Sequence, residues 1–192
     1  MKRLLLIATF LTLSFIPAYA QQEVGRGEFS WQYSYLRRDV SSLGGSSQKK
    51  MPAGFGVSIS GNITRAIAIV GDVSYNWDRS SNFLGGPDFK SHSFIFLTGP
   101  RFYIRGDKIT FFGQFMLGLA NTRDEFSQRL MMMMIKDTNF ALDIGSGMDV
   151  NLSDRISLRL FQFDYIPTHR SGDWQDNFRI KTGIVFRFGH YR

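Results

Sequence analysis

The sequence contains no cysteine, and this absence removes several kinds of chemistry at once. Without thiols the chain can form no disulfide, has no thiol nucleophile and has no thiolate ligand for a metal. Histidine is scarce, and no H-E-x-x-H motif, phosphate-binding loop or Gly-rich nucleotide fingerprint occurs. These absences exclude the common signatures of metal- and nucleotide-dependent enzymes, so we expect no cofactor, no metal and no nucleic-acid partner.

Long apolar runs are also missing after residue 20, so no segment there predicts a membrane-spanning helix. Before that point, a cationic start and the apolar run 4–15 precede Ala-Tyr-Ala at 18–20. This order predicts a cleaved signal peptide over residues 1–20 and a mature chain from Gln21. The alternative is an uncleaved anchor, but the run is too short to cross about 30 Å of hydrocarbon.

Aromatic residues and glycines are abundant, with 19 Phe, 7 Tyr, 3 Trp and 19 Gly in 192 residues. Aromatic side chains favour strands and glycine weakens helices, so this composition indicates β structure and excludes disorder. A chain of this length forms one domain, which we place over residues 21–192.

Eight segments alternate apolar and polar residues with a period of two. In the first, Phe29, Trp31 and Tyr33 alternate with polar residues, the pattern of a strand with unlike faces. The predicted strands lie within or begin at residues 28–35, 55–60, 67–77, 93–105, 109–120, 140–150, 156–160 and 178–188.

The connections between these strands alternate between long and short. Alternate connections of an up-and-down sheet lie at opposite ends, so all long loops fall on one rim. Transmembrane barrels have this asymmetry, with short periplasmic turns and longer extracellular loops. The predicted long loops are residues 37–51, 78–91, 121–138 and 168–176, and the predicted tight turns are 62–65, 106–108 and 151–154.

Alternation alone does not say which face points outward. A soluble barrel would turn its apolar residues inward, but eight strands enclose a space only just wide enough for side chains. Roughly three dozen large apolar residues would overfill it. We therefore predict an all-β fold, an eight-stranded antiparallel up-and-down transmembrane β-barrel with its apolar face toward lipid and no open edge.

The inward face then carries small residues and charges of both signs. We expect these charges to pair inside the barrel. The predicted barrel-interior charge network consists of Glu28, Asp72, Arg101, Arg105, Asp143, Asp149, Arg159, Asp164, Arg179, Lys181 and Arg187.

Two positions conflict with regular strands. Pro100 lacks the N–H that a ladder needs, so we expect a bulge or local irregularity there. Arg159, Gln162 and Asp164 cannot all face inward without an extra residue, which predicts a β-bulge near Leu160 and Phe161.

The C-terminal segment 181–188 resembles the β-signal of bacterial outer-membrane barrels, with Lys181, Gly183, Phe186 and Phe188 at its characteristic positions. Segments 99–103, 145–149 and 163–165 resemble strand motifs of one such family. The mature chain is similar to the outer-membrane β-barrel domain family related to the transmembrane domain of outer membrane protein A and to opacity proteins. The resemblance implies an eight-stranded barrel in the cell outer membrane, inserted by the barrel-assembly machinery.

Our first hypothesis for function is a non-enzymatic surface-interaction protein. Its loops would bind an extracellular protein or other surface ligand, and their basic residues either bind lipopolysaccharide phosphates or simply solvate the loops. The run Met131–Met134 is either a contact for a partner or a strand extension beyond the bilayer.

Two alternatives use other features. Inward cations such as Arg101 and Arg105 would give a small channel a preference for anions, unless they pair and plug the lumen. A lipid A-modifying enzyme needs a histidine beside a serine, and His92 and His169 are the candidates near serines, whereas His190 lies at the wrong end.

Overall fold

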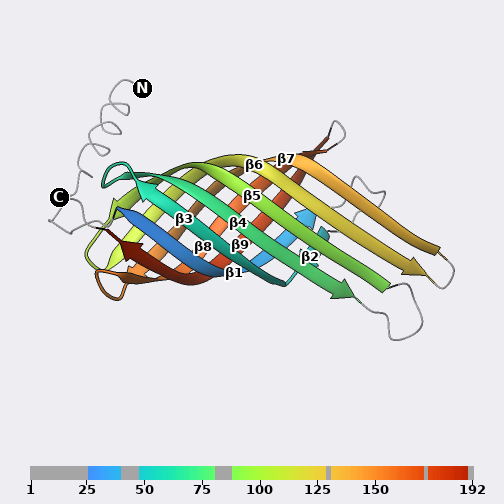
Figure 1. Ribbon diagram of the computed structural model, residues 1–192, viewed down its shortest axis with the longest axis horizontal. Coiled ribbons are helices and arrows are strands. Elements are labelled where there is room, and N and C mark those ends of the chain that lie inside the picture. The colour runs from blue at the N-terminus through green and yellow to red at the C-terminus, as the bar shows by residue number, and fades with distance from the viewer. Residues whose placement is uncertain (1–25, 40–47, 81–87, 129–130, 171–172, 190–192) are drawn as a thin grey trace, which may run out of the picture.

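The computed structural model describes residues 26–39, 48–80, 88–128, 131–170 and 173–189, which form one closed antiparallel β-barrel (Figure 1). Its strands are β1 (Gly27–Asp39), β2 (Gln48–Met51), β3 (Ala53–Asn62), β4 (Ile67–Ser80), β5 (Asp88–Arg105), β6 (Ile109–Gln128), β7 (Met131–Asn151), β8 (Ile156–Arg170) and β9 (Asp173–Phe188). No helix in this part of the chain is long and apolar enough to cross a membrane.

From β3 to β9 each strand pairs with the next, β1 pairs with β3, and β1 also pairs with β9 along most of its length, which closes the wall. β2 and β3 both pair with β1 and are separated only by Pro52, so together they supply one strand of the wall. The predicted eight-stranded up-and-down barrel is therefore confirmed. The predicted signal peptide lies outside the described residues.

The apolar face points outward. On β1, Trp31 is 58% exposed, whereas its neighbour Gln32 is fully buried. The same alternation continues around the barrel, where Phe102, Ile144 and Phe178 are exposed and the intervening residues face the lumen. The predicted orientation is therefore confirmed. The charged and small residues of the strands face the lumen, and most of the large apolar residues face outward.

The four predicted long loops, 37–51, 78–91, 121–138 and 168–176, are wrong where the structure describes them, because every described residue in these segments belongs to a strand. Residues 40–47, 81–87, 129–130 and 171–172 lie outside the described part of the chain. β6 and β7 remain paired as far as Gln128 and Met131, and β4 and β5 as far as Ser80 and Phe89. Backbone pairing persists there after the regular apolar–polar alternation has stopped, so the hydrophobic period ends before the strand does. Of the two readings of Met131–Met134, the strand extension is confirmed for the backbone.

The predicted bulge in the seventh wall strand is confirmed. The register of β8 shifts between Arg159 and Gln162 against β9, and a matching shift separates Met148 from Asp149 against β7. The extra residue lets Arg159 and Gln162 both face the lumen. At Pro100, pairing with β4 is continuous, but the ladder to β6 omits Gly99 and Pro100 without a register change. The structure therefore has the expected irregularity there and no bulge.

Candidate functional site

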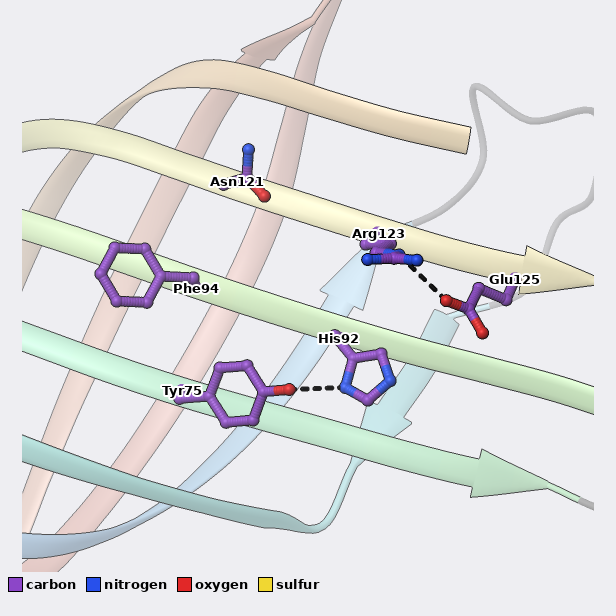
Figure 2. A pocket seen from close by; sticks show the side chains of 6 residues that line it. All are labelled: Tyr75, His92, Phe94, Asn121, Arg123 and Glu125. Atoms are coloured by element: carbon purple, nitrogen blue, oxygen red, sulfur yellow. Dashed lines mark hydrogen bonds and ion pairs between the residues drawn. The ribbon is translucent and has the colours of Figure 1, made fainter. Parts of the chain in front are cut away.

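Polar side chains gather in two places, a pocket on the outer wall and the lumen. The pocket has a volume of about 310 Å³ and lies across β4, β5 and β6 (Figure 2). Its lining consists of Tyr75, His92, Phe94, Asn121, Arg123 and Glu125. Because these residues alternate with lumen-facing neighbours such as Ser93, the pocket opens on the outer surface of the barrel.

Two pairs of side chains order this pocket. The Tyr75 Oη atom lies 2.7 Å from Nδ1 of His92, and the two rings stack at 5.9 Å. Arg123 Nε lies 2.9 Å from a Glu125 carboxylate oxygen, and this ion pair is half-exposed. From the sequence, His92 was predicted only as a candidate catalytic base. The pocket was not predicted, because the residues that line it come from three strands.

The geometry argues against the histidine–serine alternative. Ser91 and Ser93 are buried on the lumen side, whereas His92 points outward, since successive strand residues face opposite sides. His169 is exposed and packs against the ring of Trp174 at 5.1 Å. His190 and Ser171 lie outside the described residues.

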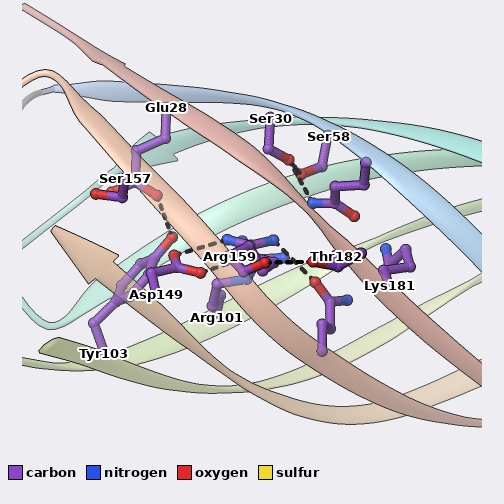
Figure 3. A network of polar contacts seen from close by, with 12 residues as sticks. Glu28, Ser30, Ser58, Arg101, Tyr103, Asp149, Ser157, Arg159, Lys181 and Thr182 are labelled. Atoms are coloured by element: carbon purple, nitrogen blue, oxygen red, sulfur yellow. Dashed lines mark hydrogen bonds and ion pairs between the residues drawn. The ribbon is translucent and has the colours of Figure 1, made fainter. Parts of the chain in front are cut away.

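The lumen holds all eleven of the predicted interior charges. Ten of these residues are buried, and the Arg105 side chain is 7% exposed. Figure 3 shows part of the network, with Asp149, Arg159 and Tyr103 projecting between the strands. The contacts join these residues into three groups.

The first group centres on Glu28, near the end with the tight turns. Its carboxylate accepts hydrogen bonds from Arg105 Nη1 at 2.9 Å and from the Tyr103 hydroxyl at 2.8 Å. Arg187 Nε lies 3.5 Å from the same carboxylate. One anion therefore holds together side chains from β1, β5 and β9.

The second group centres on Arg159, which is fully buried. Its guanidinium donates two parallel hydrogen bonds to the Asp149 carboxylate, at 2.8 and 3.0 Å, and a third to Gln162. The Phe112 ring contacts both Arg159 and Arg101, whose guanidinium carbons lie 4.4 and 4.5 Å from its centre. The bidentate pair and the cation–π contacts fix the arginine in place.

The third group joins Asp72 and Asp164 to Arg179 and Lys181. Asp72 lies 2.6 Å from Lys181 Nζ and 3.0 Å from Arg179 Nη1, and Asp164 lies 2.8 Å from Arg179. Gln114 connects this group to the rest, because it accepts from Arg101 and donates to Asp143 and Asp164.

The structure also places apolar side chains in the lumen, which sequence analysis did not predict. They form a buried cluster that includes Leu36, Met51, Leu97, Met116 and Ile166. These positions continue the inward phase of their strands, so they could have been found by extending the alternation past the charged residues. Ion pairs and this apolar cluster together fill the barrel.

The four residues of the predicted β-signal occupy different environments. Lys181 belongs to the lumen network, whereas Phe186 and Phe188 are exposed on the outer wall. Gly183 lies at the seam between β9 and β1, where a Cβ atom would come within 2.1 Å of the Trp31 carbonyl oxygen. The close approach of the two strands requires glycine there.

A further ion pair lies inside the barrel toward the end away from the tight turns. Arg38 Nη2 lies 2.6 Å from Asp124, which also accepts a hydrogen bond from Ser91. Burial alone would raise the pKa of Asp124, but the charge and hydrogen bond of Arg38 hold it below its usual range. Burial lowers the pKa of nearby Lys49.

No group of His, Cys, Asp and Glu among the described residues is arranged to hold a metal ion. The lumen carboxylates are occupied by arginine, lysine and amide donors. The chemistry of the interior is therefore that of ion pairing and packing.

Solved structures share this fold. Ail, the attachment invasion locus protein of Yersinia pestis, is 19% identical, with a TM-score of 0.61 over 85% of this chain and 99% of Ail. The crystal structure of Ail with the heparin analogue sucrose octasulfate is 15% identical, with a TM-score of 0.59 over 88% of this chain and 100% of Ail. Neisserial surface protein A is 12% identical, with a TM-score of 0.59 over 84% of this chain and 97% of that protein.

Ail and Neisserial surface protein A are eight-stranded barrels of bacterial outer membranes. At these identities the likeness shows the fold of this chain. No protein-family model matches the chain, and no curated protein matches it either. The resemblance to the outer membrane protein A and opacity family therefore stays a prediction.

Proposed function

We propose that this protein is an integral outer-membrane β-barrel without enzymatic activity, which anchors a surface-interaction structure in the membrane. Residues 1–20 would direct export, and residues 21–192 would form the barrel. The observation that carries the proposal is the reversed polarity of the fold, with an ionic lumen and an exposed apolar belt.

The dimensions of the belt support membrane insertion. Its outward-facing apolar residues span 94–104 on β5, 109–119 on β6 and 140–150 on β7. Each run covers about eleven residues, the length with which a tilted strand crosses a bilayer. Tyr33, Trp77 and Trp174 lie toward the end of the belt away from the tight turns. Amphipathic rings such as these favour the interface between the membrane and water.

The experiment that tests this proposal is fractionation combined with gel migration. We expect the protein in the outer-membrane fraction, extractable only with detergent, and migrating differently on gels before and after boiling. A protein that stays dissolved and monomeric without detergent would refute membrane insertion.

The strands that extend beyond the belt support a role in surface interaction. They carry exposed basic residues, including Arg37, Lys50 and Arg79, and the fold is shared with Ail, which was crystallised with a heparin analogue. We propose that segments 37–51, 78–91, 121–138 and 168–176 contact an extracellular protein or anionic surface ligand. Deletion of the 121–138 hairpin should abolish cell-surface binding while leaving the gel shift intact.

We propose further that lipopolysaccharide surrounds the barrel and that the barrel-assembly machinery inserts it through Lys181, Gly183, Phe186 and Phe188. The position of Gly183 at the closing seam supports the second point, since it lies where the last strand must meet the first.

The second candidate function is an anion-preferring channel, which the interior cations favour. The filling of the lumen favours the sealed anchor instead, because Arg101, Arg159 and Arg179 are at most 1% exposed and are held by neighbouring side chains. Planar-bilayer recording separates the two functions. We expect no discrete conductance steps, and steps whose anion selectivity changes in Arg101→Gln would establish the channel.

A further inference from the structure

The outer-wall pocket lies where the apolar belt gives way to charged residues. Phe94 and Phe96 mark the end of the belt on β5, and His92 and Lys90 follow on the same face. The aromatic rings of Phe55, Tyr75 and Trp77 pack against one another beside it, with centroid separations of 5.8 to 6.3 Å. In a membrane this position corresponds to the level of the lipid headgroups.

Cations concentrate on the outer face in the pocket and just beyond it. The strand register places Arg79 beside Lys90, Lys90 beside Glu125, and Arg123 beside Lys136. We call these five residues the basic band. Four of its side chains are cationic and one is anionic, so this part of the wall attracts negative charge. Asp124, by contrast, is engaged by Arg38 on the lumen side.

We propose that the pocket and the basic band bind the phosphate group of a lipid in the surrounding leaflet. Glu125 engages Arg123 through Nε and so orients its guanidinium, whose two Nη groups form a fork that suits a phosphate. When the Tyr75 hydroxyl donates to Nδ1 of His92, the His92 Nε2 atom carries the ring proton and is a second donor.

The apolar part of the pocket specifies a lipid rather than free phosphate. Phe94, which is 45% exposed, lies at the belt side of the lining, where an acyl chain would run along the wall. A bound lipid would therefore meet an aromatic surface on the belt side of the pocket and the Arg123 guanidinium in the same lining. This inference rests on the membrane insertion proposed above and names a ligand of the membrane wall.

The test is lipid titration of the refolded full chain in neutral detergent, followed by native mass spectrometry. Diphosphorylated lipid A, the same lipid without its phosphates, phosphatidylglycerol and inorganic phosphate are the four probes. We expect diphosphorylated lipid A to bind about tenfold more tightly than the dephosphorylated form, and inorganic phosphate to bind weakly. A phosphatidylglycerol affinity equal to that of lipid A would assign the site to phospholipid, which still supports a lipid-phosphate site.

Arg123→Gln should lose about tenfold in affinity for the phosphorylated lipid, and Tyr75→Phe about threefold. The control is Arg155→Gln, which removes an exposed arginine of a tight turn that lies outside the pocket. Equal losses in Arg155→Gln and Arg123→Gln would reduce the effect to general surface charge and overturn the site. Equal binding of the phosphorylated and dephosphorylated lipids would also overturn it.

The gel shift of each variant shows whether it has folded. If the wild-type chain needs no detergent, the proposed membrane insertion fails. If it inserts and folds but shows no phosphate preference, only the lipid site fails.

Discussion

Arg159 illustrates how a single charged side chain is kept inside the barrel. Its guanidinium is fully buried, so its hydration has to be replaced by fixed partners. Asp149 supplies two hydrogen bonds, Gln162 a third, and the Phe112 ring faces the cation. Removal of one partner would leave a buried charge without compensation, which costs more than the intact pair contributes.

Arg159→Met should therefore destabilise the folded barrel by about 3–5 kcal/mol. The measurement is urea unfolding in lipid vesicles, followed by the gel shift. The control is Arg155→Gln, an exposed arginine in a tight turn, for which a change within about 0.5 kcal/mol is expected. Combining Arg159→Met with Asp149→Leu should recover much of the loss, and failure to recover would argue against the uncompensated carboxylate.

Asp124 offers a test by pH outside the belt. Burial opposes its ionisation, but Arg38 outweighs burial, so its folded pKa lies below the usual value of 3.8. A depressed carboxyl pKa stabilises the fold at pH values above the unfolded pKa, and this contribution is lost as pH falls through the folded pKa. An NMR titration of the Asp124 carboxyl carbon should give a midpoint below 3.8, and Arg38→Gln should raise it. An unchanged midpoint in that variant would contradict the assignment of the cause.

Among the structural elements, β9 and β1 meet at the seam that closes the barrel. The backbone of Gly183 approaches the Trp31 carbonyl so closely that any Cβ atom would push the strands apart. Gly61 is the natural comparison, because a Cβ atom there would meet nothing within 4 Å. Both glycines lie within strands, but Gly183 faces inward against the backbone of β1, whereas Gly61 faces outward with open space beside it.

Gly183→Ala should lower stability by about 1–3 kcal/mol through overpacking, and it should reduce the yield of folded protein. Gly61→Ala should fold with the yield of the wild type. The folded fraction after dilution from urea into detergent, measured by gel shift, distinguishes the two. Equal yields would show that the seam can open at little cost.

Strand patterns allowed most of these elements to be predicted, but not their ends. The number of wall strands, the outward aromatic face and the bulge at Leu160 followed from a period of two. The ends of β6 and β7 did not, because the alternation stops beyond the belt: β6 continues with polar residues such as Arg123 and Glu125, and β7 begins with the unbroken apolar run Met131–Met134. The lumen charges could be predicted residue by residue. Their partners could not, since Gln114 joins side chains from β5, β7 and β8.

For the whole molecule, the exposed apolar belt means that the barrel needs lipid or detergent around it. Ile144 is 57% exposed near the middle of the belt, whereas Leu152 is 66% exposed in a tight turn beyond it. The two side chains are equally apolar and similarly accessible, but only one would lie at the centre of a bilayer.

Ile144→Arg should destabilise the barrel in vesicles by about 2–4 kcal/mol, and Leu152→Arg by about 0–1 kcal/mol. Urea unfolding in vesicles of fixed thickness measures both values. Similar effects of the two substitutions would contradict a bilayer around residues 140–150.

The paired strands β6 and β7 continue beyond the belt as a regular two-stranded extension. Its residues rise by about 3.3 Å each, so chemical groups along it keep fixed intervals from the membrane. Inserting one residue below the tip would exchange the two faces for everything above the insertion, whereas inserting two would preserve them. Insertions or deletions that preserve the outward face of this extension should therefore change β6 and β7 by an even number of residues each.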